Sequence, residues 1–189
     1  MLRRRKMALA MGLGLLLAVS VCFGQAFAQK KLSDKIVRLH VLANSDGAGD
    51  QAVKLKVRDA VLACADGGMP GEDDLERMRQ AAETCLRENG YDDPVRVTLE
   101  KTYFDTRVYD GFALPAGRYQ AVRVVIGAGA GHNWWCVIYP GLCTGFAEAA
   151  HSGVLTEDEL AFIRRDGQTY VVRFKLQELL SQAAHMVWG

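Results

Sequence analysis

The clearest hydrophobic pattern in the chain lies within residues 35–63. Apolar and polar residues alternate with a period of two over 37–42, which is typical of a β-strand with one buried face. A polar break follows at 44–46, made of residue types that stop strands and cap helices. Apolar residues then recur at helical spacing up to Val61. The segment predicts a strand, a polar corner and an amphipathic helix.

The rest of the chain switches between these two periods. An acidic first turn and a helical apolar stripe predict a helix over 72–88. A period of two predicts strands over 95–103 and 118–126, joined by a long bent hairpin connection, and an aromatic strand over 132–139. A capping box at Thr156, with Glu159 three residues later, opens another helix. A last strand over 170–174 and a closing helix end the pattern.

This order of elements predicts the fold class. A strand, two helices, three strands, a helix, a strand and a helix favour a single α+β domain, with helices layered on a mostly antiparallel sheet. The chain has 189 residues, of which half are hydrophobic, and this suits one globular core.

The N-terminus has the features of a targeting sequence that precedes this domain. Four basic residues over 3–6 are followed by an uncharged, largely apolar run over 7–23, and Ala26 and Ala28 form a small-x-small cleavage site. We expect a secretory signal peptide over 1–28 and the α+β domain over 29–189. The alternative is an uncleaved anchor, although the run of 17 residues is shorter than the roughly 20 that usually span a membrane.

The charge of the predicted mature chain argues against two classes of partner. Loss of residues 1–28 removes four basic and no acidic groups, which takes the formal net charge from +1 to −3. Nucleic acids and anionic lipids are held largely by clustered Lys and Arg, so neither is expected as the main partner.

Four cysteines remain after residue 28. An even number in an exported protein suggests disulfides, with three pairings open. Cys136 and Cys143 flank a turn around Pro140, and we expect these two to pair. Cys64 and Cys85 lie on successive predicted helices, where they either pair or remain small buried apolar residues.

The polar corner is the first candidate for a functional site. His40, Asn44, Asp46 and Asp50 are expected to converge there with the backbone amides of the helix start. Helix capping alone would select the same residue types, so an ordinary capped helix remains the competing interpretation. A calcium loop is excluded because residues 48 and 55, where it needs oxygen ligands, are Ala and Leu. An anion cradle is disfavoured because two carboxylates lie at the corner.

The glycines over 127–131 and the aromatic strand after them form the second candidate. A nucleotide-binding loop needs a helix at this point, so that interpretation is rejected. Trp134 and Trp135 are adjacent in a strand and therefore point to opposite faces. Either both are buried under helices, or one of them is an exposed anchor for a partner.

Catalytic and metal sites have no positive support from the pattern. A thiol hydrolase would use Cys136 or Cys143 with His132 or His40, but cysteines paired outside the cytoplasm are inert. Zinc ligands drawn from His132, Cys136, Cys143 and His151 have three, six and seven intervening residues, which match no pattern of close ligand pairs. We therefore assign no catalytic residue, metal or cofactor.

Two segments are distinctive when taken together: VRLHVLANSDGAGDQAVKLKVRDAVL over 37–62 and GHNWWCVIYPGLC over 131–143. With LEKTYFDTRVYDGFALPAGRY over 99–119 and VVRFKLQELL near the end, they resemble the stage II sporulation protein R family of endospore-forming bacteria. The resemblance covers nearly all of the chain after residue 28.

The resemblance implies a secreted signalling protein and not an enzyme. Such a protein is made in the forespore and exported into the intermembrane space between forespore and mother cell. It is required there to activate a membrane-embedded aspartic protease that processes the precursor of sigma-E. After cleavage of its signal peptide the protein would be membrane-proximal without spanning the membrane.

The contact with this protease is expected at one or both candidate sites. The first is the corner of His40, Asn44 and Asp46, and the second is the face that carries Asn133, Trp134 and Trp135. The alternative function is an extracellular hydrolase, thiol-dependent or directed at the cell wall, that acts on the pathway indirectly.

Overall fold

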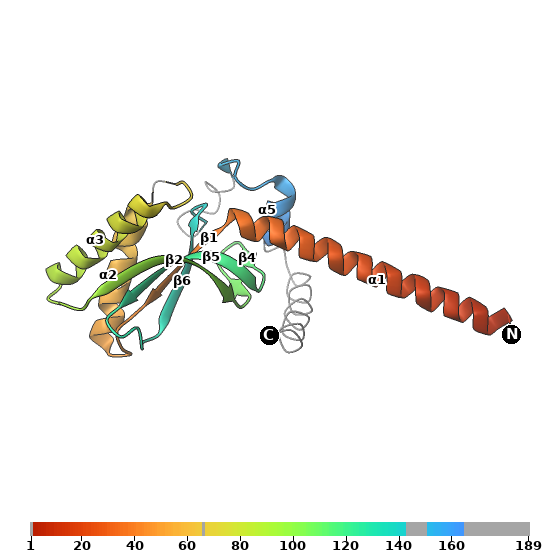
Figure 1. Cartoon of the computed structure of the whole chain (residues 1–189), viewed down its shortest axis with the longest axis horizontal. Coiled ribbons are helices and arrows are strands. Elements are labelled where there is room, and N and C mark those ends of the chain that lie inside the picture. The colour runs from red at the N-terminus through yellow and green to blue at the C-terminus, as the bar shows by residue number, and fades with distance from the viewer. Residues whose placement is uncertain (1, 66, 143–150, 165–189) are drawn as a thin grey trace.

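The computed structural model describes residues 2–65, 67–142 and 151–164. Figure 1 shows a body of sheet and helices from which one long N-terminal helix extends. The elements in chain order are α1 (Leu2–Lys35), β1 (Val37–Leu42), α2 (Ala48–Ala63), α3 (Glu72–Glu88), β2 (Val95–Phe104), β3 (Arg107–Val108), β4 (Ala113–Leu114), β5 (Gly117–Ile126), β6 (Asn133–Tyr139) and α5 (Glu157–Ile163). The predicted α+β class is confirmed. The strand and closing helix expected after residue 169 lie outside the described residues.

The main sheet has four strands in the order β2-β5-β1-β6. The pairs β2–β5 and β1–β6 are antiparallel, and β1 runs parallel to β5. The sheet is therefore mostly antiparallel, as predicted. β3 and β4 form a separate two-stranded ribbon inside the long connection between β2 and β5.

The central position of β1 corrects one expectation from the sequence. Alternation predicted a strand with one face toward solvent, but all six residues of β1 are buried. β5 and β6 flank the strand, and both faces of the sheet are covered, so Arg38 and His40 lie in the interior. The period of two correctly predicts the strand, but it does not show that a second layer covers the polar face.

α2 and α3 cover one face of the sheet, as Figure 1 shows. Their apolar stripes meet the residues of β1 and β5 that point to this side. The helices contribute Val53, Val57, Val61, Met78, Ala82 and Leu86, and the strands contribute Val37, Leu39, Val41, Val122 and Val124. Each large side chain buried in this way contributes about 1.5–3 kcal/mol. This layer is the larger part of the core and follows from the predicted helical stripes.

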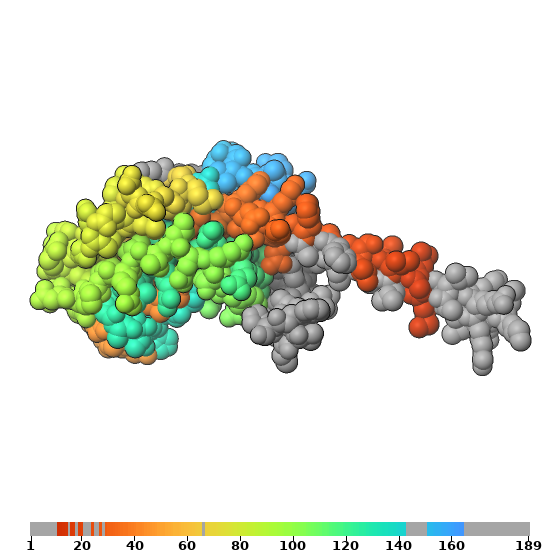
Figure 2. All heavy atoms as spheres, viewed as in Figure 1, coloured from red at the N-terminus to blue at the C-terminus, as the bar shows by residue number. Residues whose placement is uncertain are grey.

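The end of α1, the β3–β4 ribbon and α5 cover the opposite face. The core on this side includes Phe104 and Tyr119 of the sheet, together with Leu32, Ile36, Phe112, Leu114, Leu160 and Ile163. Figure 2 shows the end of α1 lying against α5, and Lys35 forms an ion pair of 2.7 Å with Glu159 between them. The capping box predicted at Thr156 is confirmed, because its hydroxyl accepts from Glu159 N–H (3.3 Å) and the Glu159 carboxylate accepts from Thr156 N–H (2.8 Å).

α1 is one continuous helix that passes through the expected cleavage site. Ala26 and Ala28 lie within it, and the helix continues for seven residues beyond Ala28. Leu32 is fully buried and the side chain of Gln29 donates a hydrogen bond to the Ala116 carbonyl. Among the described residues, no helix combines the length and the apolar character needed to cross a membrane.

Candidate functional site

The polar corner between β1 and α2 is fastened to the loop that precedes β6. The side-chain oxygen of Asn44 accepts from the backbone N–H of Ala128 (2.9 Å), and its carbonyl accepts from Ala130 (3.1 Å). Its amide nitrogen donates to Asp50 (3.2 Å), which also accepts from the Ser45 hydroxyl (2.6 Å). Because Asn44 and Ala128 are 84 positions apart, the corner forms only in the folded domain.

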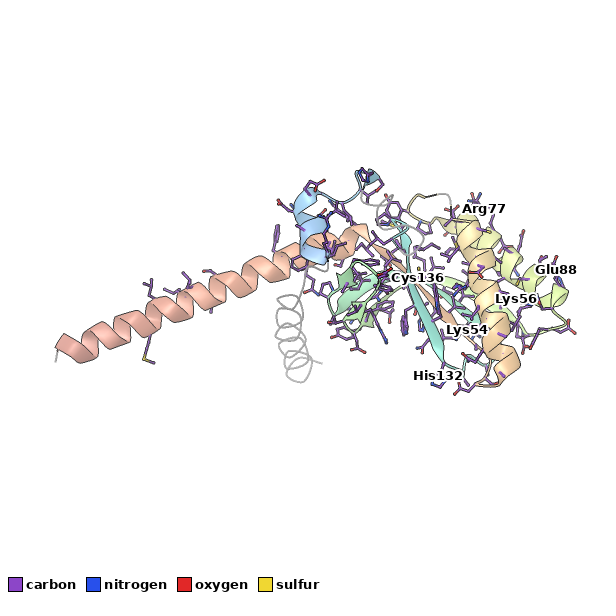
Figure 3. All side chains as sticks on the ribbon, turned by 180° about the vertical axis from the view of Figure 1, so that it is seen from behind. Lys54, Lys56, Arg77, Glu88, His132 and Cys136 are labelled. Atoms are coloured by element: carbon purple, nitrogen blue, oxygen red, sulfur yellow. The ribbon has the colours of Figure 1, made fainter. Side chains whose placement is uncertain are left out.

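A second set of bonds ties His132 to the same corner. Asp46 Oδ1 accepts from the His132 backbone N–H (2.6 Å) and lies 2.5 Å from His132 Nδ1. These bonds hold the pKa of Asp46 below its usual value. Lys54 donates to the His132 carbonyl (2.9 Å) and to Gln51 Oε1 (2.6 Å), and burial lowers the pKa of this lysine. Figure 3 shows Lys54 and His132 at the same end of the molecule.

The corner residues do not cap α2 as ordinary capping would require. The N-cap residue is Gly47, which has no side chain to bond the first helical amides. Ser45 Oγ accepts from Gly47 N–H (3.1 Å), outside the helix, while Asn44 and Asp46 bond the distant loop. The backbone amides of that loop would otherwise lack hydrogen-bond partners, so they donate to the short polar side chains of the corner.

His40 does not join this corner. It is 8% exposed in the interior of β1 and stacks on Trp135, with ring centroids 3.8 Å apart. Burial and the nearby Arg123, Arg38 and Arg107 lower the pKa of His40 to about 4, so the ring is neutral near pH 7. The expected convergence of His40 with Asn44 and Asp46 is therefore wrong, because β1 carries His40 on a face of the sheet that the corner bonds do not reach.

The two tryptophans point to opposite faces, as predicted. Trp134 packs against the α2–α3 layer, and the guanidinium of Arg58 lies 4.7 Å from its ring centroid. Trp135 packs on the other side against His40 and Phe104, with Arg107 at 5.2 Å from the centroid. Both tryptophans are half-buried, so neither is a fully enclosed core residue.

One of these faces is continuous with the corner, and we call it the corner face. It consists of Asp46, His132 and Trp134. The side chains of Asp46 and His132 are 57% and 80% exposed, and Trp134 is half-buried beside Arg58. Asn133 is exposed at the start of β6, where strand alternation directs it to the same side as Trp135. The face thus combines an exposed acidic and imidazole pair, fixed by hydrogen bonds, with the accessible part of a large aromatic ring.

A second group of polar side chains, which sequence reasoning missed, lies on the opposite face. We call it the arginine cluster: Arg38, His40, Arg107 and Arg123. Arg38 is fully buried, and its guanidinium carbon lies 4.0 Å from the ring centroid of Phe104. The pattern placed Arg38 on the polar side of a half-exposed strand, and only the ribbon and α5 on that face reveal its burial.

No disulfide joins the cysteines of the described residues to one another. Cys136 is fully buried in β6, and its expected partner Cys143 lies outside the described residues. Cys64 and Cys85 are free thiols on the α2–α3 layer, and burial raises the pKa of Cys85. Among described residues no three His, Cys, Asp or Glu side chains gather as metal ligands, and His132 bonds Asp46 instead.

Comparisons with known proteins agree on one family. A family model described as stage II sporulation protein R matches residues 33–149. Stage II sporulation protein R of Bacillus subtilis (strain 168) is 30% identical over 139 residues, which cover 68% of this chain and 61% of the relative. The match therefore spans less than two thirds of that relative's length. No solved structure matches the chain.

The matched region includes β1, the corner, α2, α3 and the main sheet through β6. It thus contains both the corner face and the arginine cluster. The chain belongs to the stage II sporulation protein R family.

Proposed function

We propose that this protein is a secreted signalling protein of sporulation, made in the forespore and exported toward the mother cell. In the intermembrane space it binds and activates the membrane-embedded aspartic protease that processes the sigma-E precursor. The observation that carries the proposal is family membership combined with an exposed, hydrogen-bonded surface at the corner. Residues 1–28 serve as the export signal, and the domain over 29–189 is the ligand.

The corner face is the contact surface that fits this role best. Asp46 and His132 are held by bonds from Lys54 and from the loop backbone, so little side-chain entropy is lost when a partner binds. Trp134 supplies a large aromatic contact, and residues of this type often dominate binding energies. Asn44 acts through the loop that it fixes, and His40 and Trp135 belong to the opposite face.

The hydrolase alternative gains nothing from the described residues, and one of its two candidate nucleophiles, Cys143, lies outside them. A nucleophilic thiol must be reachable by substrate and ionised, but Cys136 is fully buried and its Sγ is 3.7 Å from the Val137 carbonyl. A binding protein is therefore the better proposal.

The test adds a purified domain to the outer side of vesicles that carry the protease, with its sigma precursor inside. Residues 29–189 suit this purpose because they retain Gln29, Leu32 and Ile36, which pack on the domain. We expect cleavage of the precursor on addition, and none in vesicles without the protease. Lack of cleavage with a folded domain would contradict direct activation.

Two variants identify the contact surface in the same assay. Trp134→Ala is expected to weaken binding by about 2 kcal/mol, roughly thirtyfold, as an aromatic anchor does. Arg118→Ala is the matched control, because Arg118 is exposed on β5 away from the corner. Equal activity of both variants would exclude the corner face as the contact. Both variants should show wild-type circular dichroism spectra and secretion.

A further inference from the structure

Arg38 carries a buried charge that lacks a counter-charge in the described part of the chain. It is fully buried, and Nη2 donates to the Tyr109 hydroxyl (2.7 Å). Its Nε and Nη1 atoms are buried without a hydrogen-bond partner there, and no carboxylate there pairs with it. A buried guanidinium that is neither paired nor fully hydrogen-bonded is strongly unfavourable. An acidic ligand would supply the missing counter-charge and hydrogen-bond acceptors.

The unpaired atoms around Arg38 lie together. His40 and Arg123 are directly paired across β1 and β5, and His40 is also paired with Trp135 of β6. His40 Nε2 and Arg123 Nε are likewise buried without hydrogen-bond partners among the described residues. Four unsatisfied nitrogen atoms from three neighbouring side chains therefore belong to one cluster.

The cluster has an excess of positive charge. Arg38, Arg107 and Arg123 all act electrostatically on His40, which places three guanidinium groups around one ring. Among the described residues, Glu100 forms an ion pair with Arg123, at 3.4 Å from its Nη1 atom. Both of these side chains are 40% exposed. One half-buried carboxylate does not neutralise three arginines, one of them fully buried.

We propose that the arginine cluster is a binding site for a carboxylate group. The rings of Phe104 and Tyr119 lie 4.0 and 5.3 Å from the Arg38 guanidinium carbon, so N–H groups at the guanidinium edge are left for a flat acceptor. A singly charged carboxylate also costs less to bury than a doubly charged phosphate. Arg123, Arg107 and Trp135 are half-buried, and the ligand enters where these side chains meet solvent.

The carboxylate has two sources with the same chemistry. It is either a free small molecule or the side chain of an acidic residue on a protein that binds this face. In both cases it accepts hydrogen bonds from Arg123 and Arg38 and neutralises charge around His40. The site is independent of the corner face, since the two lie on opposite faces of the sheet.

The experiment titrates the full chain at pH 7 and records the His40 ring resonances by NMR together with the Tm. The probes are sodium acetate, N-acetylglutamate amide and inorganic phosphate, each against sodium chloride at equal ionic strength. N-acetylglutamine amide is the uncharged control for the second probe.

We expect a saturable shift of the His40 resonances and a rise in Tm with a carboxylate probe. A response to acetate indicates a site open to free anions, and a response to the glutamate probe alone indicates a protein-borne group.

Variants separate this site from general anion effects. Arg38→Met should abolish the response while keeping the volume of the side chain. Arg123→Gln should weaken the affinity roughly tenfold, as loss of a charge-assisted hydrogen bond does, and it remains informative if Arg38→Met fails to fold. Arg118→Met, an exposed change on the same strand as Arg123, should leave the response unchanged.

Three outcomes would overturn the proposal. The first is no saturable response to either carboxylate probe. The second is an equal response in wild type and in Arg123→Gln, which would place the anion elsewhere. The third is a response to phosphate alone, which would contradict the assigned ligand class.

Discussion

Arg38 and His40 occupy interior positions of β1 that the strand period assigns to solvent. Their burial is tolerated because aromatic rings surround them: Phe104 lies against Arg38 and Trp135 is stacked on His40. Cation–π contacts and stacking recover part of the lost hydration. At the scale of the residue, the polarity of a side chain in a strand does not by itself show whether it is buried. The elements that pack on that face of the sheet decide it.

The buried neutral state of His40 predicts a pH-dependent stability. Its folded pKa of about 4 lies below the ordinary value of 6.5, so the unfolded chain binds the proton first as the pH falls. Stability should therefore be full above pH 6.5 and decline toward pH 4, with a loss on the order of 3 kcal/mol. Urea unfolding at pH 7.5, 6, 5 and 4 measures this loss.

The comparison variant is His40→Phe, which retains a ring beside Trp135 but cannot be protonated. The carboxylates that titrate at lower pH are common to both proteins, so the difference between the two curves isolates His40. If the difference does not change between pH 7.5 and 4, the ring is not held neutral by burial.

At the scale of the element, the loop before β6 shows why two distant segments had to meet. Gly131 N–H donates to the Ala43 carbonyl (3.0 Å), and a Cβ atom at Gly131 would lie 2.2 Å from the Ser45 carbonyl oxygen. Only glycine permits so close an approach between the loop and the corner. The sequence showed the glycines as a flexible turn, whereas the structure uses this one for close packing.

Gly131→Ala should therefore destabilise the domain by about 1–3 kcal/mol, the usual cost of inserting a side chain into a packed site. Gly68→Ala is the matched control, since no heavy atom lies within 4 Å of a Cβ at that glycine. Chemical denaturation of both variants measures the difference. Equal stabilities would show that the corner and the loop move apart without cost.

At the scale of the whole molecule, the end of α1 belongs to the core. Leu32 and Ile36 are fully buried with Phe104, Tyr119 and Leu160, and the Lys35–Glu159 ion pair lies at the same junction. Removal of residues 1–28 would leave these contacts in place. The proposed export signal and the folded domain thus meet inside one helix, seven residues before its end.

Leu32→Ala should reduce the free energy of unfolding by about 2–5 kcal/mol, because it removes a fully buried side chain and leaves a cavity. Leu55→Ala, on the exposed side of α2, should change it by less than about 0.5 kcal/mol. Thermal or urea unfolding of residues 29–189 distinguishes the two. A neutral Leu32→Ala would mean that α1 is not part of the domain's core.

Local patterns in the sequence were sufficient to predict α2, α3, the capped start of α5, and the strands β1, β2, β5 and β6. They also predicted the opposite orientations of Trp134 and Trp135, because neighbouring side chains in a strand alternate. These features depend on residues close together in the chain. The family resemblance likewise rests on contiguous segments, and the family match confirmed it.

Only the tertiary structure decided which strands are neighbours and what covers each face of the sheet. The parallel pairing with β5 places β1 in the centre of the sheet, where the covering layer buries Arg38 and His40. Asn44 and Asp46 bond the loop around Gly131 and do not cap α2. Both effects join residues about 80 or more positions apart. Periodicity records which side of an element a residue occupies, but the partner on that side is set by chain topology.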